Sequence, residues 1–216
     1  MKKISSDIGK NICKPDFYLL TWIFMVGSFF GYCWETAYSF VLSGHYCNMQ
    51  GVVYGPFVQI YGFGFVLLTI FSYQIRNRNI FSVFVLSSGV GTAFEYFSSV
   101  LQEKILGVIS WDYSKSMYDL NGRVDLKATI VWGVLSVLFV KYLYPWFCRK
   151  RSRMTRKKPI KIATFALAAF MTVDLAITMG ATYRQRQRYL GIEATNSVQV
   201  FFDEHYPDNP RIKFVD

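Results

Sequence analysis

Three carboxylates stand inside stretches of the chain that are otherwise apolar. Glu35, Glu95 and Asp174 are each flanked by runs rich in aliphatic and aromatic residues. A carboxylate is costly to hold in lipid, so one in such a run normally faces protein or a wet cavity and marks a functional site. These side chains could bind a cation, a proton or the cationic group of a substrate, and burial could shift them towards proton exchange near neutrality.

The apolar stretches around these carboxylates are long enough to cross a membrane. A helical span needs about 20 apolar residues, and 52% of the 216 residues are hydrophobic. We predict an all-α integral membrane protein with about five transmembrane helices. Its helical transmembrane domain covers residues 1–182 and a C-terminal tail covers 183–216. The expected spans are residues 17–42, 53–73, 80–101, 128–147 and 162–182.

The positions of the basic residues predict an orientation. Lys and Arg gather near the N-terminus, between the second and third spans, and over 149–161, whereas the connectors 43–52 and 102–127 carry few. The positive-inside rule therefore places the N-terminus in the cytoplasm and those two connectors outside. Topology and anionic headgroups also account for the net charge of +10, so the expected partner is the lipid bilayer and not nucleic acid.

Helical periodicity places small and polar residues on the same faces as the two glutamates. These faces hold Gly27, Gly31 and Glu35 in the first span, and Ser87, Gly91, Glu95 and Ser99 in the third. Small residues let helices approach closely, so both faces should point into the bundle. Tyr54, Gln59 and Tyr61 enter the second span from outside through irregular, glycine-rich sequence. We expect them to line an outward-opening polar pocket with the three carboxylates.

The connector between the third and fourth spans mixes aromatic, acidic and turn-forming residues. Its candidate functional residues are Trp111, Asp112, Tyr113, Asn121, Arg123 and Lys127. One interpretation is an outward-facing lid, in which Arg123 or Lys127 is the counter-charge for Glu35 or Glu95. The alternative is an ordinary interfacial loop held by an ion pair between Asp112 and Arg123.

Two segments of the chain share a pattern. Residues 31–35 and 91–95 both read glycine, two variable residues, aromatic, glutamate, and an outward connector with Asn and Gly follows each. Both spans run in the same direction. The pattern is typical of a parallel internal repeat, as found in transporters.

Further motifs carry a resemblance to a known family. They are Tyr54-Gly55-Pro56, Ile60-Tyr61-Gly62-Phe63-Gly64, Phe94-Glu95-Tyr96, Trp111-Asp112-Tyr113-Ser114, Asn121-Gly122-Arg123 and Trp132-Gly133. The chain resembles the CmpB-like ABC-transporter permease family of Gram-positive bacteria over about residues 17–146, and its tail is similar through Asp174. The resemblance implies a permease in the bacterial plasma membrane. The chain departs from the family at Gln50, where an arginine is usual, and at Gln59, where a proline is usual.

The remaining residues predict no cofactor and no metal site. The four cysteines have no paired spacing and the two histidines do not cluster with them, so we expect free thiols. The chain has no Gly-x4-Gly-Lys-Ser/Thr phosphate loop. Any ATP-driven activity would need a separate ATPase subunit, and a complete pathway would need that partner or a homo-oligomer.

Three functions fit these residues. We favour a transport or transport-accessory protein in which Glu35 and Glu95, helped by Asp174, bind a cation, a proton or a cationic substrate group. The second is an intramembrane enzyme acting on a lipid or an exported polymer precursor, with two carboxylates as general acid and base; the sequence names no catalytic residue for it. The third is a structural or sensory membrane protein, in which the carboxylates pair with Arg123 or Lys127 to lock the bundle.

Overall fold

Helices make up most of the structure, and the strands are short. A computed structural model describes residues 12–215, so Lys2, Lys3 and Lys10 of the orientation argument lie outside the described residues. The prediction of an all-α membrane protein is confirmed. The helices are α1 (Phe17–Ser43), α2 (Gln59–Gln74), α3 (Ile80–Leu106), α4 (Leu126–Leu138), the π-helical segment η2 (Phe139–Leu143), α5 (Tyr144–Arg156), α6 (Lys158–Tyr189) and α7 (Ser197–His205).

Among residues 12–215, four helical segments are long and apolar enough to cross a membrane. They are α1, α3, the continuous segment Leu126–Arg151, and α6. Helix α2 has 16 residues, which gives it a length of about 24 Å, less than a hydrocarbon core of about 30 Å. It begins at Gln59, six residues after the start of the expected span, because residues 52–58 form an irregular segment.

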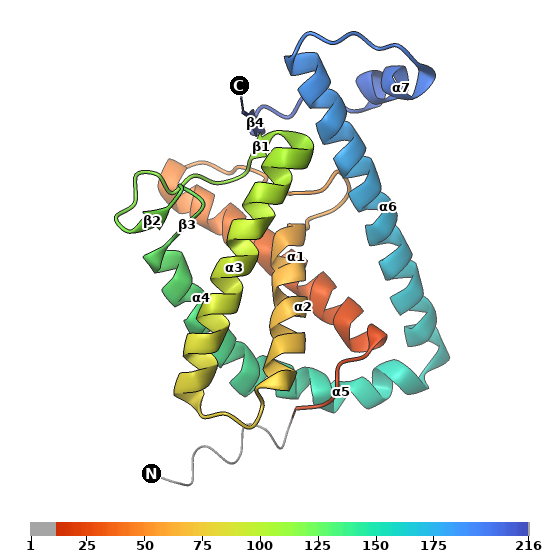
Figure 1. Ribbon diagram of the computed structural model, residues 1–216. Coiled ribbons are helices and arrows are strands. Elements are labelled where there is room, and N and C mark those ends of the chain that lie inside the picture. The colour runs from red at the N-terminus through yellow and green to blue at the C-terminus, as the bar shows by residue number, and fades with distance from the viewer. Residues whose placement is uncertain (1–11, 216) are drawn as a thin grey trace.

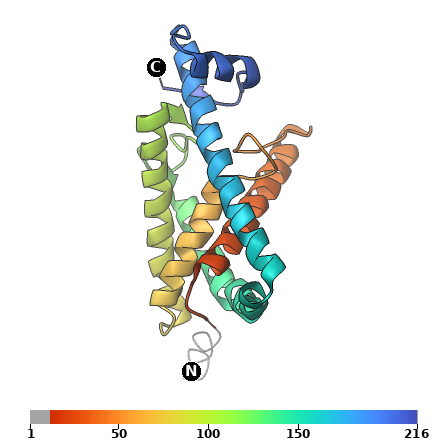
Figure 2. The ribbon, with the colours of Figure 1, turned by 90° about the vertical axis from the view of Figure 1, so that its right-hand side faces the viewer.

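The helices run alternately between the two ends of the molecule (Figure 1). Helices α1, α3 and α6 leave the end that holds residues 12–16 and α5, which we call the basic end. Helix α2 and the α4–α5 segment return to it. Figures 1 and 2 both place the C-terminus at the opposite end, beside residues 44–58 and 107–125. We call this the loop end.

Local sequence explains where three of the long helices begin and where two end. The carboxylate or amide oxygens of Asp16, Asn79 and Asp125 accept hydrogen bonds from the backbone N–H groups of the first turns of α1, α3 and α4. Gly44 and Gly107 then end α1 and α3 in the left-handed conformation, with φ of 74° and 65°. Hydropathy alone marks none of these caps.

The hydrophobic core lies towards the basic end and joins α1, α2, α3 and the α4–α5 segment. Its largest fully buried side chains are Leu19, Ile23, Leu68, Tyr144 and Phe147. The hydroxyl of Tyr144 donates to the backbone oxygen of Cys13 at 2.8 Å. The core thereby fixes the segment before α1 against α5.

A disulfide bond joins the same two segments, so the expectation of free thiols is right for two of the four cysteines and wrong for the other two. Cys13 and Cys148 are bonded, with 5.5 Å between their Cα atoms, whereas Cys33 and Cys47 are free. The two bonded residues are 135 positions apart, so no local spacing could reveal them. They meet because α4 and α5 return the chain to the basic end.

Two small sheets order the loop end. Strands β2 (Asp119–Leu120) and β3 (Val124–Asp125) form a hairpin, whose turn holds Asn121 and Gly122 at φ of 55° and 67°. Strand β1 (Val108–Ile109) pairs with β4 (Lys213–Phe214) of the tail. The tail therefore lies at the same end of the molecule as the predicted lid.

Candidate functional site

Glu35 lies on α1 and contacts α2. The phenol of Tyr61 donates to its Oε1 at 2.5 Å. One helical turn earlier, Gly31 leaves room for the same ring, since a Cβ atom at Gly31 would lie 2.5 Å from Cγ of Tyr61. Within the part of the chain that the structure describes, no other hydrogen bond reaches Glu35, so its Oε2 has no donor.

Glu95 lies on α3 and accepts two hydrogen bonds. The indole N–H of Trp132, on α4, donates to Oε2 at 2.9 Å, and the phenol of Tyr113, from the 107–125 loop, donates to Oε1 at 2.8 Å. Gly91 leaves room for the Trp132 ring, because a Cβ atom there would lie 2.5 Å from Cγ of the indole. Both oxygens of Glu95 are therefore occupied.

The two glutamates act on the same phenol. Burial, then the negative charge of Glu95, its hydrogen bond and finally the more distant charges of Asp125 and Glu35 raise the pKa of Tyr113 above its ordinary value. Both carboxylates therefore contribute to one electrostatic environment, although they come from different helices.

No basic side chain that the structure describes forms an ion pair with Glu35 or Glu95. The guanidinium of Arg123 instead pairs with Glu103 and donates to the hydroxyl of Ser99 at 2.9 Å. Lys127 is exposed. The structure thus contradicts Arg123 or Lys127 as the counter-charge for the glutamates, and it also contradicts the alternative pair of Asp112 with Arg123.

The 107–125 loop is held by its own hydrogen bonds and by α3. Trp111 donates its indole N–H to the backbone oxygen of Arg123 at 2.8 Å, and the Asn121 amide donates to the hydroxyl of Tyr96 at 3.0 Å. Asp112 accepts from the backbone N–H of Ser114, and hydrogen bonds to Ser114 lower the pKa of this carboxyl. These contacts hold the loop in place and bring the phenol of Tyr113 to Glu95.

Asp174 serves a different part of the structure. It is buried in α6, and its Oδ1 accepts from the backbone N–H of Tyr54 at 3.0 Å. One turn later, Thr178 accepts from the backbone N–H of Val53. These contacts hold the irregular segment before α2, so Asp174 touches Tyr54 and not the two glutamates. Gln59 begins α2 and places its Oε1 against Gly51.

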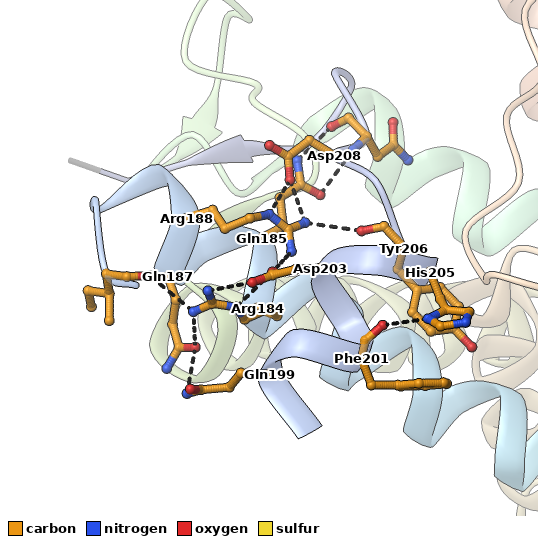
Figure 3. Close-up of polar contacts among 12 residues, drawn as sticks. Arg184, Gln185, Gln187, Arg188, Gln199, Phe201, Asp203, His205, Tyr206 and Asp208 are labelled. Atoms are coloured by element: carbon orange, nitrogen blue, oxygen red, sulfur yellow. Dashed lines mark hydrogen bonds and ion pairs between the residues drawn. The ribbon is translucent and has the colours of Figure 1, made fainter. Parts of the chain in front are cut away.

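The tail forms a polar cluster against the end of α6 (Figure 3). Arg184, which is 3% exposed, makes two hydrogen bonds with Asp203 at 2.8 and 2.7 Å. Arg188 bonds Asp203 and Asp208. Tyr206 meets the hydroxyl of Tyr54 at 2.9 Å, which links the tail to the segment before α2. Two open hollows of about 390 Å³ border this cluster, and none of the three carboxylates lines either.

Two residues that contact the predicted site residues are missed in the sequence analysis. Trp132, the donor to Glu95, appears there only as part of a family motif, and Glu103, the partner of Arg123, is not named. The signal for Trp132 is its place before Gly133, which matches Tyr61 before Gly62. Glu103 follows Ser99 by one helical turn, so it lies on the face that meets Arg123.

The chemistry open to this arrangement follows from its side chains. Two carboxylates with phenol and indole donors can exchange a proton or hold a cationic group, and no nucleophile paired with a base lies at either glutamate in the described part of the chain. Among the described residues, no group of three metal-ligating side chains lies close enough to hold a metal ion.

Comparison with known proteins gives one family. Residues 22–179 match the family described as Putative ABC-transporter type IV, which is the family that the sequence motifs resemble. The matched part includes α2, α3, α4 and both glutamates. No curated protein and no solved structure matches the chain.

Proposed function

The chain belongs to this ABC-transporter-type membrane family, and from that premise we propose a transport or transport-accessory protein with an intramembrane carboxylate site. Glu35 and Glu95 bind a cation, a proton or the cationic group of a substrate. The basic end faces the cytoplasm of a bacterial cell and the loop end faces outward. In that reducing compartment Cys13 and Cys148 are held as the dithiol form of the pair that the structure joins. A separate ATPase subunit supplies any ATP-driven step.

The observation that carries this proposal is the lack of a cationic partner for either glutamate among the described side chains. In a protein interior, an ionised carboxylate without a counter-charge is strongly unfavourable. The phenol and indole donors stabilise the carboxylates only in part, because each is neutral. A bound proton or an external cation supplies the missing positive charge.

Ligand-dependent thermal stability tests the proposal without knowledge of the substrate. Purified protein is unfolded in detergent at several pH values and in a panel of Na⁺, K⁺, Mg²⁺, Ca²⁺, choline and spermidine. A ligand that binds the folded state raises the melting temperature with its concentration. We expect at least one cation, or protons, to do so, and we expect the double variant Glu35→Gln, Glu95→Gln to lose the shift.

Two controls separate binding from general charge effects. The Glu204→Gln variant removes a glutamate of the exposed tail and should keep every shift. The double variant should keep its melting temperature without ligand within a few degrees. A double variant that retains all shifts would reject the carboxylate site.

The second candidate is a structural membrane protein in which the glutamates only hold the helices together, and one observation favours it. Each glutamate joins its helix to an aromatic donor on the neighbouring helix, as a bundle lock would. Under this function, neither glutamate needs a ligand. Loss of folding in either single Glu→Gln variant, with no cation-dependent shift in the native protein, would support it.

A further inference from the structure

Helices α1 and α2 repeat the packing of α3 and α4 residue by residue. Five residues of α1 are identical to the residues of α3 that lie 60 positions later. The pairs are Phe24 and Phe84, Ser28 and Ser88, Gly31 and Gly91, Glu35 and Glu95, and Ser39 and Ser99. The partner helices follow with a separation of 71 positions, through Tyr61 and Trp132, and Gly62 and Gly133.

The three-dimensional contacts of the two pairs correspond as well. A Cβ atom at Gly62 would lie 2.8 Å from Cδ2 of Phe24, and one at Gly133 would lie 2.8 Å from Cδ2 of Phe84. Each of these glycines also faces the serine of the matching helix, Ser28 or Ser88. The same close approach of backbone to side chain therefore occurs in both pairs.

The glutamates repeat in their surroundings. Glu35 receives a hydrogen bond from Tyr61, whose ring covers Gly31, and Glu95 receives one from Trp132, whose ring covers Gly91. In each pair, an aromatic side chain with a polar handle lies over the glycine that precedes the glutamate by one turn. The contact geometry of the two pairs thus agrees with their sequence spacing.

One residue breaks the correspondence. Glu95 has a second donor, the phenol of Tyr113, whereas no second donor to Glu35 is found among the described residues. Tyr113 comes from the loop between α3 and α4, and its backbone N–H is fixed to the oxygen of Gly122 at 2.7 Å. The hairpin turn of this loop thus positions the phenol.

We infer that the chain contains one helical hairpin twice, and that Tyr113 closes at Glu95 the ligand position that is open at Glu35. This inference rests on the proposed function for the identity of the ligand as a proton or cation. The structural part of the inference concerns only the access of a ligand to the two carboxylates. Glu35 is accessible, and Glu95 becomes equally accessible when the phenol of Tyr113 is removed from it. Tyr113 is then a positioning residue that makes two matching sites different.

A carboxyl-reactive probe measures this access directly. Dicyclohexylcarbodiimide is apolar and adds to protonated carboxyl groups within membranes, and peptide mass spectrometry identifies the modified residue. In native protein in lipid nanodiscs, we expect labelling at Glu35 and little at Glu95. In Tyr113→Ala, labelling of Glu95 should rise about tenfold, because the phenol no longer covers Oε1 and the loss of its hydrogen bond favours the protonated carboxyl that the reagent attacks. Labelling of Glu35 should stay unchanged in the folded variant.

The control comes from the same loop. Met117 is 75% exposed, so Met117→Ala should leave both labelling rates as in the native protein. Equal labelling of Glu35 and Glu95 in the native protein would overturn the inference even if Tyr113→Ala failed to fold. So would continued protection of Glu95 in a folded Tyr113→Ala variant. Because the measurement needs no transport or cation binding, its outcome is independent of the thermal-shift test of the proposed function.

Discussion

Trp132 and Glu95 join α4 to α3 through a hydrogen bond of 2.9 Å between the indole N–H and Oε2. The bond forms only because Gly91 has no side chain to displace the indole ring. A carboxylate, a glycine one turn earlier and an aromatic donor on the next helix thus act as one unit. Tyr61 and Glu35 form the same unit between α2 and α1.

Removing the indole donor should weaken the α3–α4 contact. We expect Trp132→Phe to lower the free energy of unfolding by about 1 kcal/mol, the size of a hydrogen bond between transmembrane helices. The measurement is an unfolding titration in mixed detergent. Trp34→Phe is the matched control, since Trp34 is 55% exposed and stacks on Tyr38 of its own helix. Equal losses in the two variants would contradict the role of the hydrogen bond.

The glycines under the two rings should not tolerate a methyl group. Gly31→Ala and Gly91→Ala place a Cβ atom against a ring, so each should cost about 1–3 kcal/mol through overpacking. Gly89 lies in α3, and a Cβ atom there would meet no described atom within 4 Å, so Gly89→Ala should be neutral or stabilising. Thermal unfolding of the three variants compares them. A Gly91→Ala protein as stable as Gly89→Ala would show that the ring has room to move.

Helix starts can be read from the sequence where the apolar stretch and a cap coincide. The expected spans at 17 and 80 begin where α1 and α3 begin, because Asp16 and Asn79 cap them. At the fifth span, hydropathy marks residues 162–182, but α6 covers Lys158–Tyr189. Hydropathy reports the part of a helix that suits lipid, and helical hydrogen bonding continues into the polar ends.

The candidate site is predictable only in part. Periodicity correctly indicates that Ser87, Gly91 and Ser99 are buried on one face of α3. It cannot show which residue of another helix meets that face, so Trp132 and the Glu103 pair of Arg123 are missed. Asp174 shares the signal of a carboxylate in an apolar run, yet it holds the backbone before α2. An apolar stretch shows that burying a carboxylate there is energetically unfavourable, but it does not show which residue the carboxylate contacts.

The ion pair between Arg123 and Glu103 should fasten the 107–125 loop to α3. Their side chains are 21% and 35% exposed, so the pair should be worth about 1 kcal/mol or less. Glu103→Gln should therefore speed hydrogen exchange in the loop with little change in global stability. The reversed pair Arg123→Glu with Glu103→Arg should recover part of the protection. If Glu103→Gln leaves exchange in the loop unchanged, Trp111 and Asn121 suffice to hold it.

Docking of the tail should depend on pH through Asp203. The hydrogen bond from Arg184, with that from Arg188, lowers the pKa of Asp203 from 3.8 to about 2. Because the folded pKa lies below the unfolded one, the stabilisation is complete above about pH 4 and is lost as the pH falls towards 2. Hydrogen exchange of residues 190–215, corrected for the intrinsic rate, should therefore rise on acidification over this range.

Two variants at neighbouring positions make the tail prediction specific. Asp203→Asn should expose the tail to exchange already at pH 6 and should lose most of the dependence on acid. Glu204 is exposed, and Glu204→Gln removes the same charge from the adjacent position, so this variant should behave as the native protein. If the tail of Asp203→Asn stays protected at pH 6, the pairing of Gln185 with the backbone of Asn209 holds it instead. The buried guanidinium of Arg184 makes that outcome unfavourable, because it would leave a charge without its partner.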